Sequence, residues 1–110
     1  MPNKPTRFYS NKQEKIIAKS VRGHKVANSG ATTFNKGDVV TDKVLIEAKT
    51  CTSPKKSFSV KREWIDKNRE EAFAMGKPYS AVAIDFGDGE QHYIISQKMF
   101  NMLLEALDKH

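Results

Sequence analysis

The sequence predicts one small α/β domain in which helices flank a single mixed β-sheet. Its 110 residues suffice for one hydrophobic core, and 38% hydrophobic with 29% charged residues is typical of a globular chain. Stretches rich in β-branched residues alternate with stretches whose apolar residues recur at helical spacing. The expected order of elements is α-β-β-β-α-β-β-α.

The start of the chain differs in composition from the rest. Residues 1–9 contain two prolines and the basic residues Lys4 and Arg7, without any periodicity. We expect them to form a flexible basic arm. Residues 10–110 then make up a single domain, since no internal repeat, low-complexity tract or second composition class follows.

The first helix is expected over residues 11–22. Ser10 and Gln13 have the spacing of a capping box, and Gly23 is suited to follow the helix end. Glu14 shares a face with the apolar residues of this segment, so it is predicted to point inward, where an acid needs a partner. If the helix is phased differently, Glu14 is an ordinary solvated acid.

A β-hairpin is predicted in the middle of the chain. Residues 24–27 can form a short strand, and residues 28–37 form a polar loop that leads into the hairpin. If residues 41–44 form a symmetric turn, Asp38 lies opposite Glu47, with Cβ atoms roughly 5 Å apart. Like charges are unfavourable there, and a divalent cation between the carboxylates would remove the repulsion.

Two less specific interpretations accompany this pair of acids. Asp38 and Glu47 can be an ordinary exposed pair on an open sheet face. Asp42 is nearer to Glu47 in the sequence, but a turn residue is expected to be solvated, so Asp38 is the preferred metal ligand.

The remaining chain predicts two helices and two strands. A polar, basic loop over residues 50–59 precedes them, and a Gly87-Asp88-Gly89 turn joins the strands. Ser96 can cap the last helix, whose apolar residues suit either the core or a dimer surface. The expected elements are a helix over 60–75, strands over 79–86 and 90–95, and a helix over 97–108 with apolar Phe100, Leu103, Leu104 and Leu107.

Charge and cysteine content narrow the class of protein. A net charge of +6 favours a polyanionic partner, either nucleic acid or an anionic membrane surface. The single cysteine, Cys51, excludes an internal disulfide and a cysteine-rich zinc site. The low cysteine content leads us to expect an intracellular protein. We also expect no membrane span, because the apolar runs are only a few residues long.

Four residues suggest metal-assisted chemistry on phosphates. Asp38 and Glu47 can bind Mg²⁺ through oxygen atoms, and the main-chain carbonyl of Ala48 could add another. Lys49 shares the face of Glu47, so its ammonium can orient an attacking water or neutralise the phosphate; alternatively it only pairs with an acid. Glu14 could complete a second metal site or hold a metal-bound water.

These residues resemble the PD-(D/E)XK nuclease superfamily, and most of all its archaeal-type and phage Holliday-junction resolvases. The resemblance covers roughly residues 10–96. Gly37 stands where the superfamily name has proline. Many relatives carry a glutamine or a basic residue in the helix after the lysine of the motif. No glutamine occurs there in this chain, and the candidates are Lys61 and Arg62. The residues that carry the resemblance are Glu14, Ser29-Gly30-Ala31, Gly37-Asp38 and Glu47-Ala48-Lys49.

The resemblance implies a restriction-endonuclease-like fold and an Mg²⁺-dependent endonuclease, in which Mn²⁺ could substitute. Metal-activated water would hydrolyse phosphodiesters and leave 5′-phosphate and 3′-hydroxyl ends. It also implies a homodimer that cuts opposed strands of branched DNA during recombination, in the cytoplasm of a bacterial, archaeal or phage-infected cell. By the same analogy Ser29 lies near the scissile phosphate, although it could simply shape its turn.

Basic residues near the predicted site are expected to contact DNA phosphates, which supplies affinity without reading sequence. No base-reading helix or zinc module is apparent, which favours recognition of DNA shape. One alternative is a nuclease of the same fold acting on linear, flap, nicked or single-stranded DNA, and another is a non-catalytic DNA-binding module. The residues expected to contact phosphates are Lys4, Arg7, Lys55, Lys56, Lys61 and Arg62.

Overall fold

The part of the chain that the structure describes is a mixed α/β domain of three helices and five strands. The structure, a computed structural model, describes residues 6–26 and 38–109. The order of elements matches the expected α-β-β-β-α-β-β-α. The elements are α1 (Thr6–Val21), β1 (His24–Lys25), β2 (Asp38–Val40), β3 (Val44–Thr50), α2 (Arg62–Ala74), β4 (Tyr79–Asp85), β5 (Gln91–Ile94) and α3 (Gln97–Asp108).

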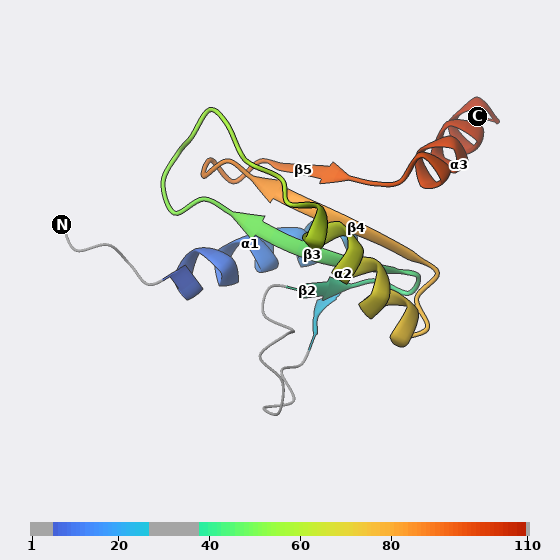
Figure 1. The fold of residues 1–110 in the computed structure, drawn as a ribbon, viewed down its shortest axis with the longest axis horizontal. Helices are drawn as coiled ribbons and strands as arrows, with labels where there is room; N and C mark the ends of the chain where they lie inside the picture. The colour runs from blue at the N-terminus through green and yellow to red at the C-terminus, as the bar shows by residue number, and fades with distance from the viewer. Residues whose placement is uncertain (1–5, 27–37, 110) are drawn as a thin grey trace.

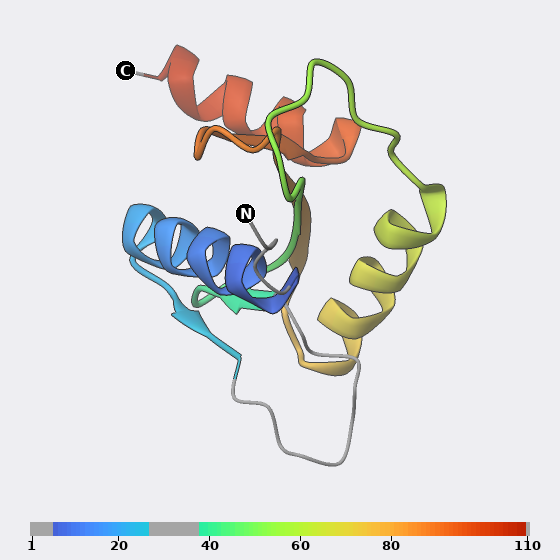
Figure 2. The ribbon, with the colours of Figure 1, turned by 90° about the vertical axis from the view of Figure 1, so that its left-hand side faces the viewer.

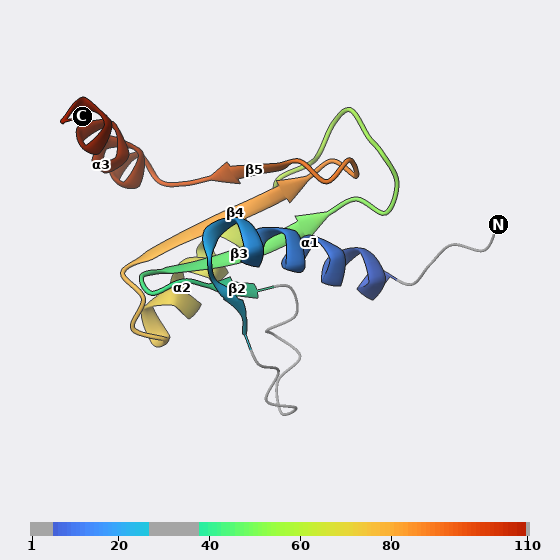
Figure 3. The same cartoon turned by 180° about the vertical axis from the view of Figure 1, so that it is seen from behind.

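The five strands form one sheet in the order β1-β2-β3-β4-β5. β3 and β4 are parallel, and the other neighbouring pairs are antiparallel. A parallel pair needs a crossover connection, and α2 supplies it. α1 and α2 cover opposite faces of the sheet (Figures 1 and 2), and α1 lies in front of the sheet in the reverse view (Figure 3).

The alternation of side chains along the strands divides the core into two layers. Val40 and Leu45 face α2, where they pack with Ala72. Because Glu47 and Lys49 follow Leu45 at intervals of two residues, they also point to the α2 face. The layer on the α1 face contains Ile17, Val39, Ile46, Ala48, Ala81 and Ala83.

α1 begins earlier than the sequence indicated. It starts at Thr6, so residues 6–9, part of the expected flexible basic arm, are helical, and Ser10 lies inside the helix instead of capping it. Gln13 does not turn back toward a cap. Its amide is buried against the sheet and donates to the carbonyl of Lys49 at 2.9 Å. This tertiary contact replaces the local capping interaction.

α1 ends in a tight turn that brings Gly23 against β2. Arg22, with φ 57°, adopts the left-handed conformation that we had expected of Gly23. The amide of Gly23 donates to the carbonyl of Ala18 at 2.9 Å, as in a Schellman motif. A Cβ atom at Gly23 would lie 2.4 Å from the Val40 carbonyl oxygen. Glycine is therefore required here for close approach to β2.

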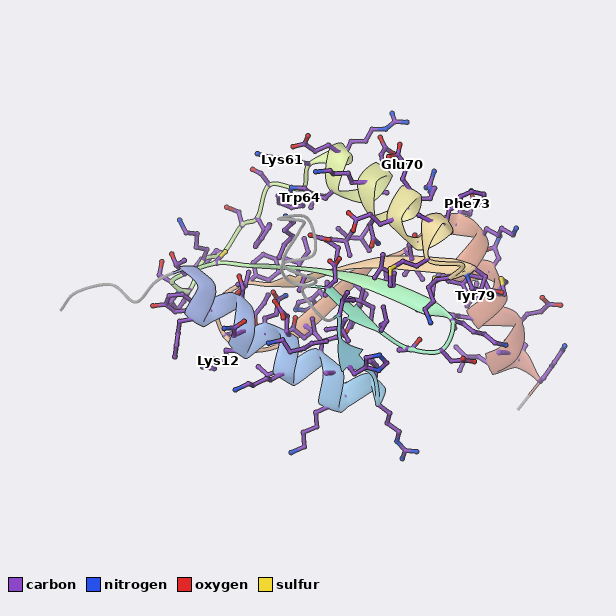
Figure 4. All side chains as sticks on the ribbon, turned by 90° about the horizontal axis from the view of Figure 1, so that it is seen from below. Lys12, Lys61, Trp64, Glu70, Phe73 and Tyr79 are labelled. Carbon is purple, nitrogen blue, oxygen red and sulfur yellow. The ribbon has the colours of Figure 1, made fainter. Side chains whose placement is uncertain are left out.

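The helix expected over residues 60–75 is shorter in the structure, where α2 spans Arg62–Ala74. Ala72 is buried, but Val60 precedes the helix and is exposed, as is Met75 after it. Phe73 is 86% exposed and lies on the outer side of the last turn (Figure 4). The polar residues Asn68 and Glu71 lie on the sheet side of this helix, where Asn68 donates to the Ala81 carbonyl at 2.8 Å.

α3 has the predicted bounds, and Ser96 caps it by accepting a hydrogen bond from the Met99 amide at 3.1 Å. None of its residues is buried, and it projects past the end of the sheet (Figure 1). Its apolar residues therefore do not join the core of this chain. In the described ranges, 6–26 and 38–109, no helix combines the length and apolarity needed to cross a membrane.

Candidate metal centre

The hairpin between β2 and β3 places two acids side by side. Asp38 is the register partner of Glu47, as predicted, and Val40 pairs with Leu45. The turn is closed by the Thr41 amide, which donates to the Val44 carbonyl at 2.9 Å. The register follows from this turn, because a shift by one residue would move every side chain to the other face.

Asp42 does not compete with Asp38 for this position. It lies in the turn and is exposed. Its main-chain carbonyl accepts a hydrogen bond from the Lys77 ammonium at 3.0 Å. The structure therefore places Asp38, and not Asp42, opposite Glu47, and the choice of Asp38 as a metal ligand stays a prediction.

A third acid, Glu71, reaches the same place from α2. One carboxylate oxygen from each of Asp38, Glu47 and Glu71 lies within 4.8 Å of the others. We name these three residues the acid cluster. Glu71 is not among the ligands expected from the sequence. Glu71 could have been found from its place beside Ala72, a buried residue of the helix that covers the face to which Glu47 points.

Asp38 has an unusual electrostatic environment. It is 1% exposed, and neither of its carboxylate oxygens accepts a hydrogen bond from any described residue. Burial, interaction with Glu47 and the charges of Glu71 and Glu14 raise the pKa of Asp38 to about 10. Burial and the charge of Glu47 also raise the pKa of Glu71. The raised pKa values indicate that the positive charge beside the acid cluster does not balance its acids, and a bound cation would add to it.

Glu14 points inward from α1, as predicted, but its partner is a lysine. It is 5% exposed, and its carboxylate lies 3.5 Å from the Lys25 ammonium. Burial raises the pKa of Glu14, and the Lys25 charge opposes this shift. Glu14 is not one of the three acids whose oxygens converge. Its role in a second metal site stays a prediction.

Lys49 lies beside the acid cluster. Its Nζ atom is 3.6 Å from Glu47 Oε1 and 4.7 Å from the centre of the Trp64 ring. Its placement on the face of Glu47 agrees with the strand alternation predicted from the sequence. The side chain of Ala48 belongs to the core layer that faces α1. The use of the Ala48 carbonyl as a ligand stays a prediction.

The predicted phosphate contacts have different surroundings. Lys55, Lys56 and Lys61 are exposed, on the loop before α2. Arg62 is exposed and lies 3.5 Å from the Asp66 carboxylate, one turn along α2. Arg7 falls in the first turn of α1. Ser29 and Lys4 are outside the described residues.

The acid cluster has the donor set of a hard cation. Carboxylate oxygens are the ligands that Mg²⁺ and Mn²⁺ use in proteins, whereas thiolate and imidazole groups favour other metals. The buried Asp38 side chain, which has no donor within residues 6–26 and 38–109, is the observation that fits a cation best. The three acids could therefore hold a divalent metal ion. No protein-family model, curated protein or solved structure matches the chain.

Proposed function

We propose that this protein is a metal-dependent endonuclease of the restriction-endonuclease-like fold that hydrolyses phosphodiester bonds in branched DNA. The observation that carries the proposal is a buried carboxyl group, Asp38, that receives no hydrogen bond from the described residues and faces two further acids. A lysine beside that cluster and a net charge of +6 support DNA as the substrate. The resemblance to Holliday-junction resolvases supports a four-way junction as the preferred DNA.

The acid cluster would hold Mg²⁺, or Mn²⁺ in its place. When bound, such an ion lowers the pKa of a coordinated water and stabilises charge on a phosphoryl oxygen. The protein's own contribution is to present Asp38, Glu47 and Glu71 from three different elements at one place. At neutral pH Asp38 keeps its proton in the isolated protein, and its carboxylate would become a ligand when that proton is released.

Lys49 is suited to the phosphate that approaches this site. Its ammonium carries three donors and can orient the attacking water or offset negative charge on the phosphate oxygens. The exposed Lys55, Lys56 and Lys61 would bind flanking phosphates. Carboxylates that face phosphates without a cation would repel DNA, so the acid cluster argues against a module that only binds DNA.

The proposed enzyme acts as a homodimer, which would bring two sites to opposed strands of a junction. The support is α3, whose apolar side is exposed along the helix and unpaired with the core. Such an enzyme would act on recombining DNA in the cytoplasm of a bacterial, archaeal or phage-infected cell.

Cleavage assays with labelled DNA test the proposal. Purified protein with Mg²⁺ should introduce paired symmetric nicks in a four-way junction and leave linear duplex intact. Asp38→Asn and Lys49→Ala should each reduce cleavage by roughly 10²-fold or more while junction binding persists. The matched control is Asp42→Asn, which changes the exposed acid of the same hairpin and should cleave normally.

Other outcomes of the same assay identify the alternatives. Equal cutting of junction, flap and linear duplex indicates a general nuclease of this fold. Tight binding without cutting of any DNA indicates a non-catalytic DNA-binding module. Normal cleavage by both the Asp38 and Lys49 variants, or full activity in excess chelator, would overturn the assignment of the site.

A further inference from the structure

The only tryptophan of the chain lies next to the lysine of the proposed site. The Lys49 ammonium is 4.7 Å from the centre of the Trp64 ring and 3.6 Å from a Glu47 oxygen. An indole ring attracts a cation on its face, and the attraction increases when the cation is partly removed from water. The side chain of Lys49 is 31% exposed, so this condition is met.

Trp64 is itself held in place by other aromatic rings. Phe58 contacts it edge to face at 6.0 Å, and Phe58 in turn contacts Phe86 at 5.9 Å. The loop that carries Phe58 is tied to the end of β4, because the Lys55 amide donates to the Phe86 carbonyl at 2.9 Å. Figure 4 shows Trp64 on the sheet side of the first turn of α2. These contacts therefore fix the position of the indole ring.

A lysine beside three carboxylates needs such a support. Its four-carbon stem is flexible and its ammonium is a compact charge, so beyond its ion pair with Glu47 it could turn further into the acid cluster, toward Asp38 and Glu71. It would then occupy the place that a divalent cation requires. Contact with the Trp64 face keeps the ammonium next to Glu47, at the margin of the cluster.

We propose that Trp64 is a positioning residue, whose indole face holds the Lys49 ammonium beside the acid cluster so that lysine and cation occupy separate places. The consequence for catalysis rests on the proposed function. The contact between Trp64 and Lys49 does not, and it can be tested without DNA.

The first experiment uses the fluorescence of Trp64 in the metal-free protein. Lys49→Met should change the intensity or wavelength of the emission, since it removes the cation on the ring, and circular dichroism should confirm an unchanged fold. The control Lys56→Met alters an exposed lysine of the adjacent loop and should leave the emission unchanged. Identical emission from Lys49→Met and wild type would overturn the proposal.

The second experiment separates kcat from KM on the junction. Trp64→Leu should lower kcat about tenfold, equivalent to about 1.4 kcal/mol at 25 °C, without a change in KM. Trp64→Phe, which keeps an aromatic face, should recover most of the activity, and Phe73→Leu, which changes an exposed ring on the same helix, should behave as wild type.

The outcomes distinguish this proposal from the proposed function. A raised KM with unchanged kcat in Trp64→Leu would overturn positioning in favour of stacking on a DNA base. Unchanged kinetics in Trp64→Leu would also overturn it. If the wild-type protein cleaves no DNA, the proposed nuclease function fails, and the fluorescence comparison alone decides whether Trp64 holds Lys49. If Trp64→Leu does not fold, Trp64→Phe and Lys49→Met provide the test.

Discussion

A buried carboxyl group without a hydrogen-bond donor is costly in its ionised form, and Asp38 is such a group among the described residues. Most buried acids are paired, as Glu14 is with Lys25. Asp38 instead faces the acids Glu47 and Glu71, and with a pKa of about 10 it keeps its proton at neutral pH. The site therefore sacrifices stability in the metal-free protein, which is a common feature of functional sites.

Metal-free stability should depend on pH through Asp38. The pKa of this carboxyl rises from 3.8 to about 10 on folding. Between these values the folded state keeps a proton that the unfolded state has released, so the free energy of unfolding falls as pH rises. One proton accounts for a slope of up to about 1.4 kcal/mol per pH unit.

Urea denaturation in chelator from pH 5 to pH 8 measures this dependence. Asp38→Asn should reduce the slope and raise the stability at pH 8, because the amide cannot ionise. Part of the slope should remain, since the pKa values of Glu14 and Glu71 are also raised on folding. Equal slopes for the variant and the wild type would contradict the pKa assigned to Asp38.

Glu71 should contribute directly to metal affinity. Glu71→Gln removes one charged oxygen donor of the acid cluster, and the affinity for Mn²⁺ in a calorimetric titration should fall about tenfold or more. Glu70→Gln is the matched control, because Glu70 is the exposed neighbour on the same helix. Equal affinities for the two variants would exclude Glu71 as a ligand.

At the scale of elements, the hairpin and the last helix could be predicted because their information is local. The turn at residues 41–44 and strand alternation determined the pairing of Asp38 with Glu47. Ser96 and helical spacing determined α3. The start of α1 could not be predicted in this way, because Gln13 bonds to the Lys49 carbonyl of the sheet instead of a local cap.

Gly23 joins α1 to the sheet by close approach, and it should not tolerate a side chain. Gly23→Ala would place a Cβ atom 2.4 Å from the Val40 carbonyl oxygen, so backbone movement is required. We expect a loss of about 1–3 kcal/mol in the free energy of unfolding, measured by denaturant titration. Ser20→Ala, at an exposed position of α1, should change it by less than about 0.5 kcal/mol, and an equal effect would contradict this account.

At the scale of the whole molecule, α3 stands apart from the three layers formed by α1, the sheet and α2 (Figure 2). Its apolar side is exposed, although Ser96 caps it and its bounds match a well-formed amphipathic helix. An apolar helical side of this kind needs a partner surface in water. A second copy of the chain is the partner that the proposed function requires.

The dimer can be tested by changing the apolar side of α3. The double variant Leu103→Asp and Leu107→Asp should convert a dimer to a monomer in light scattering after size-exclusion chromatography, because it places charge on the exposed apolar side. Glu105→Gln, a polar change on the same helix, should remain dimeric. A wild-type monomer at all concentrations would contradict the proposed dimer.

The sequence by itself determined the order of elements, the hairpin register and the pair formed by Asp38 and Glu47, because turns and strand alternation act over a few residues. Only the tertiary structure decided the third acid. Glu71 lies 24 positions after Glu47 and approaches it because α2 packs on the face of β3 to which Glu47 points. The same crossover brings Trp64 to Lys49, and no local pattern encodes contacts made by packing a helix on a sheet.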